Sequence, residues 1–323
     1  MERELVTLTG FILSLQQNVD EATGDFSILV NAIGLACKAV STAVRKAGIL
    51  NLYGMEGSVN VQGEEVKKLD IIAHDNFVSA LRLCTKAGIL VSEEVEEPII
   101  LGKGKYCVCF DPLDGSSNID CNVSTGSIVA IYKRENPDAE PTIQDALRPG
   151  KDLEAALYCM YGSSTQMVLT FGTSVHLFTL DPSVGEFILT SRDMQIPSPG
   201  KKIFSCNEGN TKNFDDAVKT LVARFKEESY SARYVGSMVS DLHRTLLYNG
   251  VFMYPAAPKP KLRLLYEANP MSLIIENAGG VSVAGKGKRI LDIVPTEIHE
   301  RVPIFVGGKR DLAIVEEELA KLE

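Results

Sequence analysis

Three segments near the start of the sequence carry apolar residues at helical spacing. They are residues 5–19, 27–47 and 67–84, and polar or glycine-rich stretches separate them. Apolar residues three and four positions apart share one face of a helix, so each segment predicts an amphipathic helix. Thr23 and Gly24 favour a helix start just before the second segment. The stretch 51–65, rich in glycine and polar side chains, predicts a loop with a little strand.

Short apolar runs farther along the chain predict strands, and two of the runs are followed by acids. Runs 88–91 and 106–110 precede the pairs Glu93–Glu94 and Asp111–Pro112. A further strand is predicted at 127–132. Turns of glycine, serine and proline separate four more runs, a pattern typical of an antiparallel sheet. These four runs are 155–161, 166–171, 175–180 and 186–190.

The proline-rich stretch 196–200 is the best candidate for a domain boundary. Predicted strands and helices alternate beyond it. The strands are 203–206, 251–254 and 262–266, and the helices are 214–226, 235–248, 270–278 and a last one from Asp311. Strand 262–266 ends at Glu267. The sequence therefore predicts a fold of the α/β class with mixed sheets, divided into residues 1–195 and 196–323.

Residues 111–118 read Asp-Pro-Leu-Asp-Gly-Ser-Ser-Asn. The proline fixes its own φ and favours an extended residue before it, so the Asp111 and Asp114 carboxylates can converge with the Leu113 carbonyl. The glycine and serines at 115–117 offer backbone N–H groups and hydroxyls suited to a phosphate. The stretch predicts neighbouring metal and phosphate sites. The alternative is a pair of ordinary turn dipeptides in a polar loop.

Six carboxylates are candidates for a metal site. They are Asp70, Glu93, Glu94, Asp111, Asp114 and Glu267. An oxygen-only set without paired histidine or cysteine selects Mg²⁺ or Mn²⁺, and so much negative charge implies several cations. Such a site favours direct hydrolysis of a phosphate ester. The basic residues nearest to Glu267 suit an anionic substrate, although they could equally form a solvated face. They are Arg233, Arg244, Lys259, Lys261 and Arg263.

Composition narrows the class of protein. Of the 323 residues, 45% are hydrophobic and 23% are charged, as in an ordinary globular protein, and the net charge of -9 with no basic block argues against nucleic-acid binding. The sequence holds no unbroken run of about eighteen apolar residues, so no membrane span is expected. The charged start lacks the order of a secretion signal. The seven cysteines lie scattered in apolar runs and indicate reduced thiols in a cytoplasmic protein.

Two motifs carry a resemblance to a known family. Residues 111–118 resemble the signature of the lithium-sensitive, metal-dependent sugar and inositol phosphatases. Residues 261–270, which read Lys-Leu-Arg-Leu-Leu-Tyr-Glu-Ala-Asn-Pro, are similar to the gluconeogenic fructose-1,6-bisphosphatases of animal type. The similarity extends from about Leu5 to Val306.

The resemblance implies the sugar phosphatase fold, a sandwich of alternating helix and sheet layers (α-β-α-β-α). It implies an allosteric, AMP-binding region in residues 1–195 that carries part of the metal site, and a catalytic, sugar-bisphosphate-binding region in residues 196–323. The implied reaction is hydrolysis of the 1-phosphate of fructose 1,6-bisphosphate, inhibited by AMP, in a cytoplasmic homotetramer. About two to three Mg²⁺ ions, or Mn²⁺ or Zn²⁺ in their place, are implied per subunit.

The resemblance also implies roles for individual residues. Metal ligands are Asp70, Glu93, Glu94, Asp111, Leu113 through its carbonyl, Asp114 and Glu267. Asp70, Glu94 and Asp114 are the catalytic candidates. Substrate ligands are Gly115, Ser116, Ser117, Asn207, Arg233, Tyr234, Tyr254, Lys261 and Arg263, with Arg233 reaching a neighbouring subunit's site. AMP ligands are Thr23, Gly24, Asp25, Phe26, Ser27, Lys105, Tyr106 and Lys133.

The sequence departs from the family pattern at a few positions. Asp25 and Ser27 replace the usual Glu and Thr, and Lys133 stands where Arg is typical. Lysine keeps the charge but lacks the bidentate fork, which predicts weakened AMP sensitivity. Asn210 replaces a tyrosine that helps bind the 6-phosphate, and loop 256–260 is short, with proline at its last position.

Three alternative functions follow from the same residues. One is another sugar bisphosphatase, such as an enzyme acting on sedoheptulose 1,7-bisphosphate. A second is a catalytically inactive regulator that binds AMP or a sugar phosphate, although such a protein would be expected to have lost one of the six acids. Inositol monophosphatase activity fits less well, because the separate basic set suits a second phosphate.

Overall fold

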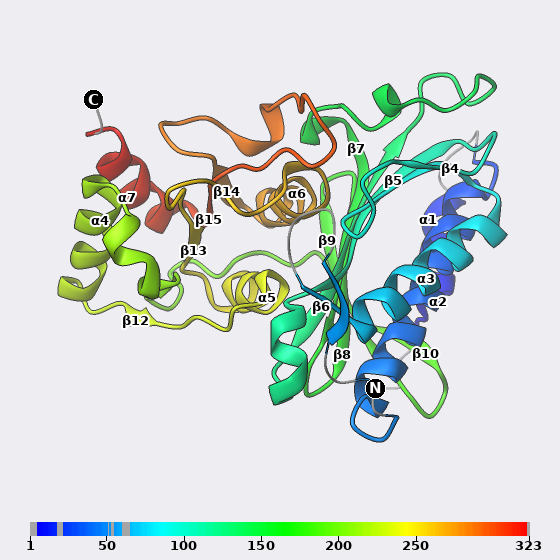
Figure 1. Ribbon diagram of the computed structural model, residues 1–323, viewed down its shortest axis with the longest axis horizontal. Coiled ribbons are helices and arrows are strands. Elements are labelled where there is room, and N and C mark those ends of the chain that lie inside the picture. The colour runs from blue at the N-terminus through cyan, green and yellow to red at the C-terminus, as the bar shows by residue number, and fades with distance from the viewer. Residues whose placement is uncertain (1–4, 18–21, 51, 53–54, 60–64, 322–323) are drawn as a thin grey trace.

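The computed structural model describes residues 5–17, 22–50, 52, 55–59 and 65–321. Helices and sheets alternate in layers across the molecule, as Figure 1 shows from α1–α3 at one end to α4 and α7 at the other. This arrangement confirms the expected layered α/β class.

The first layer consists of three helices that cover one face of the larger sheet. They are α1 (Leu8–Gln16), α2 (Asp25–Lys46) and α3 (Lys68–Cys84). The three predicted helices are confirmed: α1 and α3 are shorter than predicted, and α2 begins two residues earlier and ends one residue earlier. Residues 18 and 19 of the first predicted helix lie outside the described residues. Apolar positions of α2, such as Leu29, Ile33 and Val40, are fully buried because they repeat at helical spacing.

The sequence predicts no membrane span, yet α2 is long and apolar enough to be a candidate for one. By length and composition alone it could cross a membrane, with a mean hydropathy of 1.6 over its most apolar window, half of which is buried inside the molecule. Its few polar residues interrupt every long apolar run, so the sequence contains no unbroken apolar segment of spanning length at this helix. The burial of one face and the contacts with α3 and β7 are those of a core helix.

The larger sheet has eight strands in the order β10-β9-β8-β7-β6-β5-β3-β4. Their bounds are β3 (Ala87–Ser92), β4 (Ile99–Ile100), β5 (Tyr106–Asp114), β6 (Thr125–Lys133), β7 (Leu153–Tyr161), β8 (Thr165–Phe171), β9 (Ser174–Asp181) and β10 (Glu186–Ser191). Only β3 and β5 run parallel, and the other neighbours are antiparallel. A separate pair, β1 (Met55–Val59) and β2 (Glu65–Lys67), precedes α3.

Two helices separate the eight-stranded sheet from a second sheet of five strands. Helices α5 (Met238–Tyr248) and α6 (Asn269–Asn277) contact β6 and β7 on one side and β14 and β15 on the other. The second sheet has the order β12-β11-β13-β15-β14. Its strands are β11 (Ile203–Ser205), β12 (Ser231–Ala232), β13 (Val251–Tyr254), β14 (Gly280–Val283) and β15 (Ile304–Gly308). Helices α4 (Asp216–Glu227) and α7 (Lys309–Leu319) cover its outer face.

Three local predictions are wrong. Residues 262–266 do not form a strand, because Leu264–Ala268 is a π-helical turn that leads into α6. A short apolar run cannot distinguish a strand from a buried helical segment, and here the run is buried on all sides. Strand β5 does not stop at Asp111 but continues through Pro112 to Asp114. Helix α5 begins at Met238 rather than at 235.

Candidate active site

Strands β3 and β5 bring acids to one edge of the larger sheet because they are parallel and the acids follow directly after their last paired residues. Ser92, the last residue of β3, pairs with Phe110 of β5. The Glu93 N–H then donates to the Phe110 carbonyl at 3.2 Å, so the ladder extends to the first acid. Glu93 and Asp111 therefore leave neighbouring strands side by side.

A bulge in β5 separates Asp111 from Asp114. The register against β6 shifts between these two residues, and the Leu113 N–H donates to Asp111 Oδ1 at 2.9 Å. Ser127 Oγ donates to the Pro112 carbonyl at 2.7 Å and holds the bulge against β6. Such bulges re-aim side chains near active sites, and here both carboxylates are buried against the same pocket.

The start of α5 holds Asp114. Oδ2 accepts hydrogen bonds from Ser237 Oγ at 2.6 Å and from the Val239 N–H at 2.9 Å, and Oδ1 accepts from the Met238 N–H at 3.1 Å. A helix N-terminus favours negative charge, so it stabilises this carboxylate in one orientation. Gly115 has φ +74°, and a Cβ there would lie 2.7 Å from Ser237 Cβ, so only glycine permits this approach.

The π-helical turn before α6 delivers Glu267. The Arg263 N–H donates to Glu267 Oε2 at 2.6 Å, and the Ala268 N–H donates to the Arg263 carbonyl at 2.9 Å. The buried Arg263 guanidinium lies 2.8 Å from Glu93 Oε1 and 3.8 Å from Glu267 Oε2. One cation therefore joins acids from both halves of the chain. Asp70 enters from α3, where its Oδ2 accepts the Lys67 N–H at 2.9 Å.

All residues predicted as metal ligands line one pocket. They are Asp70, Glu93, Glu94, Asp111, Leu113, Asp114 and Glu267. Most of the predicted substrate residues line it as well. They are Gly115, Ser116, Ser117, Tyr234, Tyr254, Lys261 and Arg263.

Two predicted substrate residues do not line the described pocket. The Asn207 side chain caps a short 3₁₀ helix (Glu208–Asn213) by accepting the Gly209 N–H at 3.1 Å. Arg233 is exposed, and its guanidinium donates to the Ala232 carbonyl at 3.0 Å. Arg244 of the predicted basic set does not line the pocket either. Its guanidinium donates to Asp241 at 2.6 Å.

Burial and mutual repulsion raise the pKa values of three of the clustered acids, Asp111, Asp114 and Glu267. Burial is the main cause in each case: it raises the pKa of Glu267 to about 8 against the opposing effect of Arg263, and the pKa of Asp114 to about 6 against its three hydrogen bonds. The pKa of Asp111 is raised further by the nearby charges of Glu93 and Asp114. The cluster is therefore short of positive charge.

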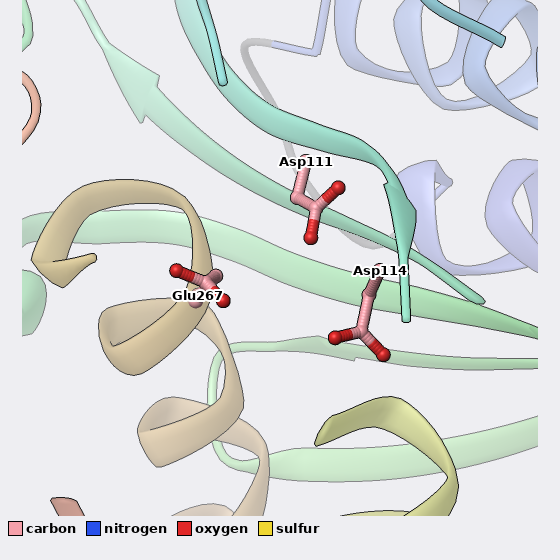
Figure 2. A group of neighbouring side chains, drawn as sticks. All are labelled: Asp111, Asp114 and Glu267. Atoms are coloured by element: carbon pink, nitrogen blue, oxygen red, sulfur yellow. The ribbon is translucent and has the colours of Figure 1, made fainter. Parts of the chain in front are cut away.

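Three of these acids meet the geometric requirement for sharing a cation. Asp111, Asp114 and Glu267 are buried and offer carboxylate oxygens within 4.8 Å of one another. Figure 2 shows the two aspartates extending from β5 and the glutamate from the helical turn, with their carboxylates facing a common space. Because all donors are oxygens and carry excess negative charge, the residues fit a hard divalent cation.

Sequence reasoning missed Ser237 and Asp241. Ser237 caps α5, and Asp241 accepts the N–H groups of Val235 and Gly236 at 3.1 and 3.2 Å, which shapes the pocket wall. The missed signal was a serine directly before an apolar helical segment, the usual start of a helix.

Comparison with known families shows to which family this chain belongs. A family model described as "Fructose-1-6-bisphosphatase, N-terminal domain" matches residues 6–192, and one described as "Fructose-1-6-bisphosphatase, C-terminal domain" matches residues 196–320. The chain belongs to the fructose-1,6-bisphosphatase family. The cytosolic fructose-1,6-bisphosphatase of a Saccharum hybrid is 54% identical over 96% of this chain and 92% of the relative. That of Brassica napus is 53% identical over 96% and 94%.

A solved structure shares the fold of this family member. The holo form of Leishmania major fructose-1,6-bisphosphatase superposes with a TM-score of 0.91 at 40% identity, covering 97% of this chain and 98% of the other. The family expected from the motifs is therefore confirmed. The curated relatives named here come from plants, and the narrower expectation of an animal type stays a prediction.

All residues that the resemblance to fructose-1,6-bisphosphatases assigned to AMP line a second pocket at the start of α2. They are Thr23, Gly24, Asp25, Phe26, Ser27, Lys105, Tyr106 and Lys133. This cavity of about 670 Å³ lies within the size range of small-molecule sites. Asp25 Oδ2 lies 2.5 Å from Lys105 Nζ and its Oδ1 lies 2.7 Å from Lys86 Nζ, and these bonds hold the pKa of Asp25 well below its ordinary value.

Proposed function

We propose that this chain hydrolyses the 1-phosphate of fructose 1,6-bisphosphate to give fructose 6-phosphate and phosphate. The observation that supports this proposal best is one pocket in which the six predicted carboxylates lie beside Ser116, Ser117 and two cationic side chains, Lys261 and Arg263. Acids to hold metals, hydroxyls for the reacting phosphate and a cation such as Lys261 for a second phosphate are the groups that a bisphosphatase needs. The relatives' names support the same substrate.

Mg²⁺ is the metal that the donor set supports best. Asp111, Asp114 and Glu267 would hold one ion, and Asp70, Glu93, Glu94 and the Leu113 carbonyl supply ligands for about one or two more. When bound, Mg²⁺ would supply positive charge for the transferring phosphoryl group and would make the attacking water more acidic. Mn²⁺ satisfies the same preference for oxygen ligands, and Zn²⁺ suits it less.

The remaining steps belong to side chains. Either Asp70 or Glu94 accepts the one proton that the attacking water loses as its oxygen bonds to phosphorus, and the sugar O1, which leaves as its bond to phosphorus breaks, takes up a proton. The hydroxyls of Ser116 and Ser117 donate to the reacting phosphate. The three donors at the start of α5 keep Asp114 in one orientation throughout. Tyr254 and Lys261 hold the distal phosphate at the other side of the pocket.

The substrate is tested by phosphate release from two sugars. Purified protein with Mg²⁺ is expected to hydrolyse fructose 1,6-bisphosphate with a higher kcat/KM than sedoheptulose 1,7-bisphosphate. Chelation with EDTA should abolish both activities. A higher kcat/KM for the seven-carbon sugar would overturn the assignment, and no metal-dependent turnover of either sugar would favour an inactive regulator.

We propose that the second pocket binds AMP as an allosteric inhibitor. Gly24, at φ +80°, opens α2 toward this pocket, and Lys105 and Lys133 supply positive charge for a phosphate. Because lysine lacks the bidentate geometry of arginine, Lys133→Arg should lower the AMP concentration for half-inhibition several-fold. Lys151→Arg, on the surface beside Asp292, is the matched control and should leave inhibition unchanged. Equal AMP inhibition of all three proteins would contradict this role of Lys133.

The names of the relatives support the location, and the exposed surface supports the assembly. We assign the chain to the cytoplasm because the relatives named above are called cytosolic. The homotetramer remains a prediction, for which the exposed apolar side chains of the first helical layer give support.

A further inference from the structure

A third pocket lies apart from the acidic pocket and from the one at the start of α2. It is formed by the C-terminal part of α2, the 3₁₀ helix η1 (Ser116–Cys121) and the turns that flank β6 and β7. Its volume is about 300 Å³, enough for a small metabolite. Nothing in the proposed reaction or in the proposed AMP site uses it.

The lining of this pocket differs from that of the other two in charge. Its described residues include many hydroxyls and one guanidinium but no carboxylate. They are Ser41, Val44, Arg45, Ile119, Asn122, Val123, Ser124, Thr125, Tyr161, Gly162, Ser163 and Thr165. Within the described part of the chain, Arg45 forms no ion pair, and its guanidinium donates only to the Ser41 carbonyl at 3.3 Å. No carboxylate among the described lining residues therefore neutralises this positive charge.

Thr125 supplies an independent observation. Only 1% of its surface is exposed, and its Oγ1 has no hydrogen-bond partner among the described residues. A buried hydroxyl without a partner destabilises a fold, so a native protein keeps one mainly where something else satisfies it. Nearby, Ser41 Oγ and Thr165 Oγ1 bond each other at 2.6 Å, which shows that the other buried hydroxyls of this wall are paired.

We propose that this pocket binds a small organic anion, with a phosphate or carboxylate group against Arg45 and the Thr125 hydroxyl. Charge-assisted bonds from a guanidinium and a hydroxyl suit either group. Val44, Ile119 and Val123 provide an apolar wall for the body of the ligand. The binding site is independent of the proposed reaction and lies toward the opposite end of α2 from the proposed AMP pocket.

Hydrogen bonds connect this pocket to the bulge of β5 that carries Asp111 and Asp114. Tyr161 lines the pocket, and the Tyr161 hydroxyl and Ser127 Oγ share a hydrogen bond of 2.6 Å. Ser127 Oγ in turn donates to the Pro112 carbonyl within the bulge of β5. Helix η1 also contributes to both pockets, with Ser117 on the acidic side and Ile119 on this one. An occupant thus contacts groups that hold the metal-binding bulge.

Phenylphosphonate is a suitable probe because it joins an anionic group to an apolar ring and its C–P bond resists hydrolysis. Crystals of the full chain soaked with phenylphosphonate in EDTA, which leaves the acidic pocket repulsive to anions, should show it on Arg45 and Thr125. Density for the probe only at the start of α2 or in the acidic pocket would overturn the proposal.

Calorimetric titration of three variants separates binding from folding. Arg45→Ala should weaken the affinity for phenylphosphonate about tenfold, whereas Lys46→Ala, which removes an exposed cation from the next position of α2, should not. Thr125→Val should also weaken binding but leave the melting temperature equal or higher, because it removes an unpaired hydroxyl. Equal affinities in all variants, or a Thr125→Val variant that binds normally and melts lower, would contradict the site.

Discussion

The Asp114 carboxylate has two roles: it binds the start of α5 and it belongs to the acidic pocket. Its carboxylate accepts three hydrogen bonds from the start of α5 and also belongs to the buried acidic group with Asp111 and Glu267. The helix start reduces the cost of keeping the carboxylate charged, while burial increases it. The residue therefore links metal binding to the position of a helix from the other half of the chain.

Removal of this carboxylate should abolish turnover. In Asp114→Ala we expect kcat to fall by at least about a hundredfold, because a pre-positioned charge at the reacting centre is lost. Circular dichroism should show a folded protein. Asp216→Ala, which removes a surface carboxylate whose side chain is 98% exposed, is the control and should keep full activity. Normal Mg²⁺-dependent activity in Asp114→Ala would refute the assigned role.

The raised pKa values of the acids predict an unusual dependence of stability on pH in the metal-free protein. The pKa of Glu267 is raised from 4.5 to about 8 and that of Asp114 from 3.8 to about 6. A folded state that binds protons more tightly than the unfolded state loses stability as pH rises through this window. The melting temperature in EDTA should therefore fall between about pH 5 and about pH 8.

Two comparisons test that the acidic cluster causes this loss. Saturating Mg²⁺ should remove most of the decrease, because the ions replace protons as the compensating charge. Glu267→Gln should flatten the decrease in EDTA. If the melting temperature of the metal-free protein rises over this window, the acids are not repelling one another in the folded state.

The sequence predicted the acids of the pocket better than its other residues. All seven predicted metal ligands follow from strand ends and motif spacing together with the family resemblance, and all seven line one pocket. Asn207 does not line it, because its side chain caps its own helix. Arg233 was expected at a neighbouring subunit's site, and its exposed position leaves that expectation a prediction. Ser237 was missed because its partner, Asp114, lies more than a hundred residues earlier.

At the scale of elements, the Ser237 side chain has two roles: it stabilises the start of α5 and it positions an acid of the pocket. Its Oγ accepts the Ser240 N–H at 3.2 Å as an N-cap and donates to Asp114 at 2.6 Å. Ser237→Ala should cost about 1 kcal/mol of stability through the lost cap. It should also lower kcat about tenfold through the lost donor to Asp114, the proposed metal ligand, since loss of a ligand's hydrogen-bond partner reduces activity or metal affinity by about 10- to 100-fold.

Asp215 offers a matched control for this element. Its side chain caps α4 by accepting the Val218 N–H at 2.8 Å, far from the acidic pocket. Asp215→Ala should lose a similar amount of stability in urea denaturation but keep normal kcat. Equal losses of activity in the two cap variants would show that Ser237 acts only through stability.

Element boundaries were predictable where the period was long and were not where tertiary contacts decide. Helix α2 repeats its apolar pattern over many turns, and its position was predicted to within two residues at the start. The turn Leu264–Ala268 is too short to show a period, and Pro270 just after it sits at a helix start that tolerates proline. The π-helical form of this turn is a tertiary outcome near a candidate active site.

At the scale of the whole molecule, the two halves are joined by a common core. Buried residues of β6 and β7, among them Ile128 and Tyr158, pack with Leu242 of α5 and Ile274 of α6. The acidic pocket lies at the same junction. The layered class was predictable from the order of elements, but this sharing of one core between the halves was not, because it depends on contacts between distant segments.

The first helical layer exposes large apolar side chains that predict self-association. Leu35, Leu83 and Ile49 are 62%, 79% and 82% exposed. Light scattering after size-exclusion chromatography should give the mass of four chains. Leu35→Glu should lower that mass, whereas Val294→Glu, at a residue 61% exposed in the C-terminal half, should not. The mass of a single chain for the unmodified protein would contradict the tetramer.

The division of the acidic pocket between the two halves also sets an order of events during synthesis. Asp114 and Glu267 are 267 − 114 = 153 residues apart. A ribosome adding roughly 5–20 residues per second needs about 8–30 seconds to cross that interval. Until then the nascent chain carries its N-terminal acids without Arg263 or the α5 start. The newborn chain therefore cannot assemble this metal site before the C-terminal half has been made.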